Sequence, residues 1–188
     1  MATLARGGAT ASPRPVPAVK AVAGVSAATA GRYVFAGVRI ALGWVCLWAF
    51  RDKLFGLGHE TAAKAAWING GSPTNGFLGR AAAGPFKGFY NSIAGAGWAD
   101  WLFMLGLLGI GVALILGIGL RFAAAAGALL LVLMWTAVLP PANNPFMDDH
   151  LIYAGVLVGL ALTQAGDTLG LGRWWGGTAL VRKAPWLR

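Results

Sequence analysis

Four blocks of apolar residues constrain this fold more than any other feature of the sequence. They cover residues 32–51, 99–120, 122–139 and 145–165, and each is close to the ~20 residues with which an α-helix crosses a ~30 Å hydrocarbon core. Hydrophobic residues make up 57% of the chain and charged residues 11%, which is typical of a membrane protein. No segment alternates apolar and polar residues as a barrel strand does. The sequence therefore predicts an all-α integral membrane four-helix bundle.

The fourth block is the weakest of the four. Its densest apolar run covers only residues 151–162, and a run of that length would also suit a buried helix of a soluble protein. Proline is favoured at the first position of a helix, and asparagine is a favoured cap. We therefore expect the fourth span to begin at Pro145, with Asn144 as its cap.

The segments outside the blocks divide the rest of the chain. Residues 1–31 are rich in Ala, Gly, Pro and Ser, which predicts a disordered tail. Residues 32–173 would form the four-span domain, and residues 174–188 a basic, aromatic tail at the membrane interface. The long first loop carries many aromatic residues and should also lie on the membrane, with residues 84–93 as a short helix. It would be either a simple lid over polar helix ends or a gate over a site.

The basic residues indicate an orientation rather than a nucleic-acid ligand. The net charge is +9, but the Lys and Arg residues are scattered without a compact basic patch. Of the fifteen, nine lie in the two tails and the turn after the second block, against five in the first loop. By the positive-inside rule, we expect a multi-pass protein of the cell membrane with both termini in the cytoplasm.

Cysteine and histidine are too scarce for a resident redox centre. Cys46, inside the first block, is the only cysteine, so one chain can form neither a disulfide nor a thiolate cluster. His59 and His150 are the only histidines, and His59 lies outside the blocks. We expect no haem held by two histidines of this chain and no metal site.

Arg39 lies inside the first apolar block, where a guanidinium must find a partner, reach an interface or serve a function. It would either pair with backbone carbonyls or extend toward the interface as a structural anchor, or it would contact a cofactor. Along a helix, the fourteen positions from Arg39 to Lys53 correspond to ~21 Å. These two cations therefore cannot share one small substrate.

A polar cluster opens the fourth block at its predicted outer end. Asp148, Asp149 and His150 are consecutive, and carboxylates at this position suit the positive end of a helix dipole. Tyr153 follows on the face of Asp149. Lys53 reaches the same membrane level, so we expect it to pair with Asp148 or Asp149. Such a pair would either fix the helix packing or form part of a site for an anion or for proton exchange.

Small residues recur every four positions in the second block, at Gly109, Ala113 and Gly117. This pattern lets a second helix approach closely. The partner helix would belong either to the same bundle or to a second subunit or copy of the chain.

Short motifs occur in a fixed order relative to the four blocks. They are Arg39-Ile-Ala-Leu-Gly43, Trp48-Ala-Phe50, Asp52-Lys53-Leu54, Leu116-Gly-Ile-Gly119-Leu-Arg121, Asn143-Asn-Pro145, Asp149-His150-Leu-Ile-Tyr153 and Leu169-Gly-Leu-Gly-Arg173-Trp174-Trp175. In order and placement they resemble the DoxX/DoxD membrane proteins. The resemblance covers nearly all of residues 32–175. A carboxylate often found within the second span of that family has no counterpart here except Asp100, at the start of the block.

The resemblance implies a four-helix membrane bundle and two alternative functions. The first is a membrane subunit of a quinone-linked oxidoreductase, similar to the thiosulfate:quinone enzyme, with quinone as the acceptor. The second is a non-catalytic anchor or assembly subunit of a redox complex. A transporter is disfavoured because no inverted repeat is visible. The expected site residues are His150, Asp149 and Lys53 for catalysis, and Tyr153, Trp48 and Arg39 for contact with the quinone.

Overall fold

The computed structural model describes residues 26–188, so most of the expected disordered tail lies outside the described residues. Every regular element within them is helical. The long helices are α1 (Ala27–Phe55), α3 (Gly97–Leu116), α4 (Leu120–Ala137) and α5 (Asp149–Leu162). The shorter elements are α2 (Lys87–Ile93), α6 (Gly172–Gly176), α7 (Ala179–Lys183), η1 (Ala63–Ala65), η2 (Trp67–Asn69), η3 (Phe77–Ala81), η4 (Gly84–Phe86), η5 (Ala165–Asp167) and η6 (Pro185–Leu187).

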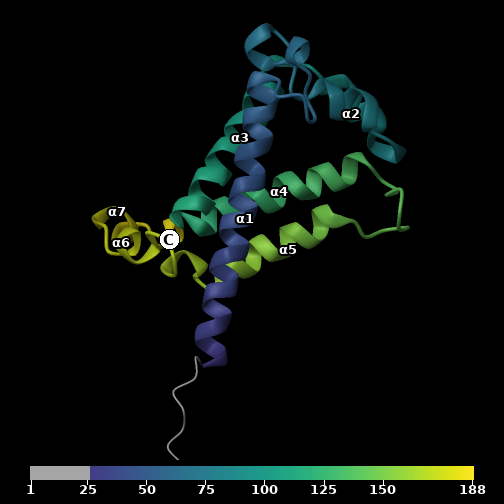
Figure 1. The fold of residues 1–188 in the computed structure, drawn as a ribbon. Helices are drawn as coiled ribbons and strands as arrows, with labels where there is room; N and C mark the ends of the chain where they lie inside the picture. The colour runs from purple at the N-terminus through teal and green to yellow at the C-terminus, as the bar shows by residue number, and fades with distance from the viewer. Residues whose placement is uncertain (1–25) are drawn as a thin grey trace, which may run out of the picture.

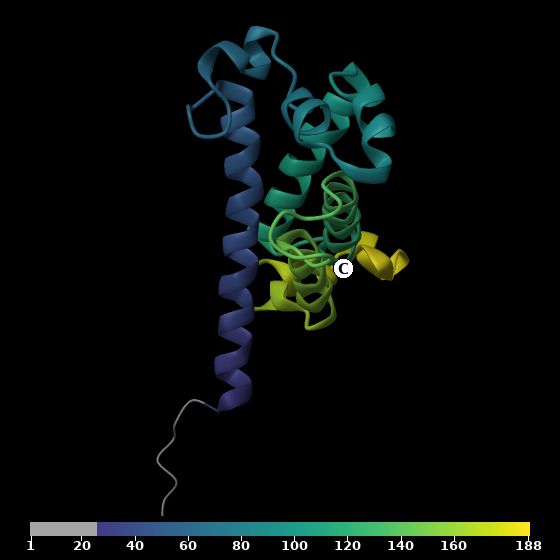
Figure 2. The same ribbon diagram turned by 90° about the vertical axis from the view of Figure 1, so that its right-hand side faces the viewer.

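The four long helices form two pairs that cross. α1 packs along α3, and α4 packs along α5 (Figure 1). In Figure 1, α4 and α5 run across α1, and the view in Figure 2 looks nearly along them. A short turn at residues 117–119 joins α3 to α4 and thereby links the two pairs. The start of α5 is therefore held by α4 and not by the end of α1.

Three helices, α1, α3 and α4, are long and apolar enough to cross a membrane by length and composition. α5 has 14 residues and is shorter than the expected fourth span, residues 145–165. The predicted cap was also wrong. Asn144 Oδ1 accepts hydrogen bonds from the N–H groups of Phe146 and Met147, and so forms a turn before the helix. Asp148 is the residue that caps α5.

The first helix is longer than its apolar block. Ser26 caps α1 by accepting the N–H of Thr29 at 3.2 Å, so residues 27–31, expected in the disordered tail, are helical. Alanine-rich sequence favours the helix there. At the other end, Gly56 adopts a left-handed conformation (φ 67°) and terminates the helix.

Glycine lets α1 and α3 approach closely, but not through the predicted stripe. A Cβ at Gly111 would lie 2.7 Å from Leu47 Cγ and 3.1 Å from the carbonyl oxygen of Gly43. By contrast, a Cβ at Gly109 would meet no atom within 4 Å. Gly117 is the left-handed residue that ends α3. The close contact between α1 and α3 therefore depends on Gly43 and Gly111. Gly111 lies two positions after Gly109 and is not part of the predicted stripe.

The first loop is folded and lies over the end of α4. The predicted helix at residues 84–93 is confirmed, as η4 followed by α2. Tyr90 of α2 is buried, and its hydroxyl donates a hydrogen bond to the carbonyl oxygen of Leu133 at 3.0 Å. The N–H of Ala83 donates to the carbonyl oxygen of Ala137, the last residue of α4, at 2.8 Å.

Asp100 fixes the other side of this loop. Its Oδ1 accepts hydrogen bonds from the Ser72 hydroxyl at 2.9 Å and from both the backbone N–H and the hydroxyl of Thr74, at 3.0 and 2.6 Å. Asp100 lies in the first turn of α3 and is buried. A carboxylate there also complements the helix dipole. The loop is thus tied to both α3 and α4.

The C-terminal segment is a folded part of the structure rather than a separate tail. It begins with α6 and turns back, so that the indole N–H of Trp175 donates to the carbonyl oxygen of Leu187 at 2.7 Å. The carbonyl oxygen of Arg188 accepts a hydrogen bond from the N–H of Arg121 at 2.9 Å, and the Arg188 guanidinium forms an ion pair with Asp167 at 3.0 Å. Residues 174–188 therefore pack against the start of α4.

A first prediction concerns the α1–α3 contact. Gly111→Val should force α1 and α3 apart, because the added carbons collide with Leu47 and with the backbone at Gly43. Overpacking of this kind costs about 1–3 kcal/mol, which would lower the thermal unfolding midpoint of the protein in detergent. The matched control is Gly109→Val on the open face of the same helix, which should leave the midpoint unchanged. Equal midpoints for the two variants would contradict the described contact.

Candidate functional site

Arg39 is fully buried, and its guanidinium joins two segments of backbone. Nη1 donates to the carbonyl oxygens of Leu114 and Ile115, the latter at 3.0 Å. Nη2 donates to the carbonyl oxygens of Thr168 and Leu169, at 3.3 and 2.7 Å. We call this arrangement the Arg39 clamp. It connects the last turn of α3 with the segment that follows α5.

The Arg39 clamp has a clear physical basis. The last carbonyl groups of a helix have no partner within that helix, and a cation near them complements the dipole. Four carbonyl oxygens also offset the cost of removing the guanidinium from water. A Cβ at Gly117 or Gly170 would come within 3.0 Å of its nitrogens, so backbone encloses the group. Of the alternatives predicted for Arg39, the structure shows the pairing with backbone carbonyls.

The polar cluster at the start of α5 is organised by Asp148. Its Oδ1 accepts the N–H of His150 at 3.1 Å, and its Oδ2 lies 2.8 Å from His150 Nδ1. Asp149 is further away, with Oδ1 3.6 Å from Nδ1, and its side chain is 68% exposed. The Asp148 and His150 side chains are only 14% and 19% exposed. Asp148, which sequence analysis did not include among the site residues, is therefore the close partner of His150.

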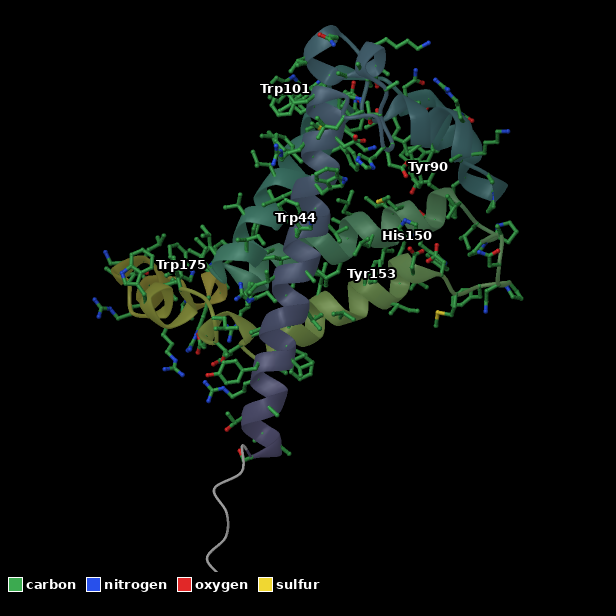
Figure 3. All side chains as sticks on the ribbon, viewed as in Figure 1. Trp44, Tyr90, Trp101, His150, Tyr153 and Trp175 are labelled. Atoms are coloured by element: carbon green, nitrogen blue, oxygen red, sulfur yellow. The ribbon has the colours of Figure 1, made fainter. Side chains whose placement is uncertain are left out.

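This contact determines what His150 can do chemically. A carboxylate beside Nδ1 favours the tautomer that carries its proton there. Nε2 is then the atom that can bind or exchange a proton with a ligand. The Phe77 ring, from η3 of the first loop, lies 6.5 Å from the His150 ring between centroids. Tyr153, 41% exposed, is also on α5, close to His150 (Figure 3).

Lys53 and Trp48 lie in a different place. Both line an open groove of about 510 Å³ along the end of α1. Lys53 takes part in none of the ion pairs among residues 26–188, so the expected pair with Asp148 or Asp149 is not formed. The reason is the crossing of the two helix pairs, which places the start of α5 away from the end of α1 (Figure 1).

Asp52 has a structural role that sequence analysis missed. It is 1% exposed and accepts the backbone N–H groups of His59 and Glu60, at 3.3 and 3.0 Å. These bonds fold the chain back after α1 ends. The sequence contains one feature that could have predicted this role. An aspartate near the C-terminus of a helix is unfavourable with respect to the helix dipole, so it needs hydrogen-bond donors from another segment.

The start of α5 is also the one group of residues, within the part of the chain described, that could approach a metal ion. One ligand atom each from Asp148, Asp149 and His150 lies within 4.8 Å of the others. Carboxylate and imidazole together suit several divalent metals. In the present arrangement, however, Asp148 is occupied as the cap of α5 and as the partner of His150.

Comparison with known proteins does not assign the chain to a family. No family model matches, and neither the curated proteins nor the solved structures include a match.

A second prediction concerns the Arg39 clamp. Arg39→Gln removes most of the donors and leaves buried carbonyl oxygens of α3 and of residues 168–169 without partners. A buried acceptor left without a partner costs about 1–3 kcal/mol, so the unfolding midpoint in detergent should fall. Arg32→Gln is the control, because Arg32 is exposed and makes one long contact of 3.4 Å to Thr168. If Arg39→Gln were as stable as Arg32→Gln, the clamp would have no structural importance.

Proposed function

We propose that this chain is a four-span membrane protein of the DoxX/DoxD type and the membrane subunit of a quinone-linked oxidoreductase. The three apolar helices and the order of the motifs support this assignment. α5 is ~21 Å long at 14 residues, and the segment before it would complete its crossing.

The proposed orientation follows from the contacts at the two ends of the molecule. The Arg39 clamp joins the end of α3 to residues 168–169, and Arg121 binds the C-terminal segment. We call this the inner end. The basic residues at this end are Arg32, Arg121, Arg173, Arg182, Lys183 and Arg188. By the positive-inside rule, it would face the cytoplasm, and the first loop and the start of α5 would form the outer end.

The observation that carries the proposed function is the contact between Asp148 and His150 at the outer end. A bound quinone accepts two electrons and two protons. His150 would contact one quinone carbonyl oxygen through Nε2 and pass a proton to it, while Asp148 would hold the imidazole ring through Nδ1. Phe77 and Tyr153 would line the quinone ring. Asp149, at the exposed rim, would exchange protons with water.

The electrons would come from thiosulfate, in line with the resemblance. Two thiosulfate ions lose one electron each as they join through a new sulfur-sulfur bond to form tetrathionate, and the two electrons pass to the quinone. We do not include Lys53, Trp48 or Arg39 in this site. Lys53 and Trp48 line a separate groove, and the Arg39 guanidinium is engaged by backbone carbonyls.

A third prediction tests the quinone site. His150→Ala should weaken the binding of a short-chain quinone to the purified protein by about tenfold, the effect of one good buried hydrogen bond to a charged group. Calorimetric titration of the protein in detergent with the quinone measures this affinity. His59→Ala, the other histidine of the chain, is the matched control and should bind normally.

The same variants should behave alike in membranes, where His150→Ala lowers thiosulfate-dependent quinone reduction and His59→Ala does not. Asp148→Asn should reduce the rate, because the His150 ring loses the carboxylate that holds it through Nδ1. Normal quinone binding by His150→Ala would rule out this site.

The second candidate function, a non-catalytic anchor or assembly subunit, is favoured by a different observation. Gly109 lies on an open part of α3, where a Cβ would meet nothing within 4 Å. A helix of a second subunit could pack there closely.

A fourth prediction separates the anchor from the enzyme. If the chain is an anchor, gentle extraction should recover a partner that carries redox centres in a fixed ratio, and Gly109→Leu should release it without lowering the unfolding midpoint. Recovery of the protein alone, with quinone bound, would instead support the enzyme.

A further inference from the structure

The groove along the end of α1 combines an apolar wall with a charged rim. Its lining consists of Trp44, Val45, Trp48, Ala49, Asp52, Lys53 and Glu60. The side chains of Trp44 and Val45 are 52% and 58% exposed, so the apolar wall is open to the surroundings. The rings of Trp44 and Trp48 lie 6.0 Å apart, and the Trp48 ring lies 5.1 Å from that of His59. Aromatic rings thus extend from the helix to the turn that follows it.

The position of the α1 groove along the helix matches the layers of a bilayer. α1 has 29 residues and is ~43 Å long, which exceeds a ~30 Å hydrocarbon core. Lys53, in its last turn, would therefore lie at the level of the lipid headgroups. Trp44 is nine residues, or ~13 Å, deeper. The groove thus changes from apolar to charged along the same direction as a phospholipid molecule.

The charges at the rim select the kind of headgroup. Lys53 supplies one positive charge and the exposed Glu60 one negative charge. The buried Asp52 carboxylate and the C-terminal end of α1 add to the negative side. This balance disfavours a simple anion such as a thiosulfate dianion. It suits a ligand with both a cation and an anion. Glu60 and the face of Trp48 can take an ammonium group, and Lys53 can take a phosphate.

We propose that the α1 groove is a binding site for a zwitterionic phospholipid with a primary ammonium group, as in phosphoethanolamine lipids. Lys53 binds the phosphate, Glu60 accepts a charge-assisted hydrogen bond from the ammonium, and an acyl chain lies on Trp44 and Val45. A quaternary choline group cannot donate that hydrogen bond, which makes the site selective between the two common zwitterionic headgroups. This site does not depend on the proposed function, because His150 takes no part in it.

The test uses delipidated full-length protein in detergent. It is titrated with phosphatidylethanolamine, phosphatidylcholine or phosphatidylglycerol of identical acyl chains, and bound lipid is counted by native mass spectrometry. We expect the ethanolamine lipid to bind about three- to fivefold more tightly than either of the others, which corresponds to one exposed ion pair. Glu60→Gln should abolish the preference, and Lys53→Gln should weaken the binding of all three lipids.

Two substitutions that remove the same charges elsewhere serve as controls. Lys64→Gln and Asp149→Asn lie outside the groove and should leave lipid binding unchanged. The proposal is overturned if the three lipids bind equally, if the choline or glycerol lipid is preferred, or if Glu60→Gln retains the ethanolamine preference. A competition experiment gives a further outcome that overturns it. If an added quinone, or a second copy of the chain, displaces the lipid from the wild type but not from Trp44→Ala, that competitor is the occupant of the groove.

Discussion

The Arg39 clamp is the interaction on which the rest of the arrangement depends. One guanidinium supplies hydrogen bonds to the unpaired end of α3 and to the segment after α5, two parts of the chain that are more than fifty residues apart. Without it, the enclosed carbonyl groups of both segments would lie in an apolar environment without donors, which is costly. The clamp therefore fixes where the α4–α5 pair crosses the α1–α3 pair.

This crossing separates the polar cluster at the start of α5 from the groove at the end of α1. The close contact of Gly43 with Gly111 holds α3 against α1, while α5 follows α4. His150 is consequently covered by the first loop through Phe77, whereas Lys53 lies beside Trp48 on the open side of α1. The His150 cluster and the groove along α1 are thus kept apart on one small protein.

Local signals in the sequence predicted much of the fold but not the meeting of distant segments. Hydrophobic length identified the helices, and the buried position of Arg39 required an internal partner, which the structure supplies. The prediction that Lys53 pairs with Asp148 or Asp149 was wrong. It assumed four parallel helix axes, and apolar periodicity does not reveal the angle at which two helix pairs cross. Asp148 was missed as the partner of His150, because capping depends on which residue actually starts α5.

The most direct test of this account is photochemical labelling with a quinone that carries a reactive azide, followed by peptide mapping of the labelled protein in native membranes. The central claim is that quinone binds beside His150 and not beside Lys53. We predict labels on Phe77 or on the first turns of α5, reduced in His150→Ala. Labels confined to residues 44–60 would contradict the account, because they would place the quinone in the groove of α1.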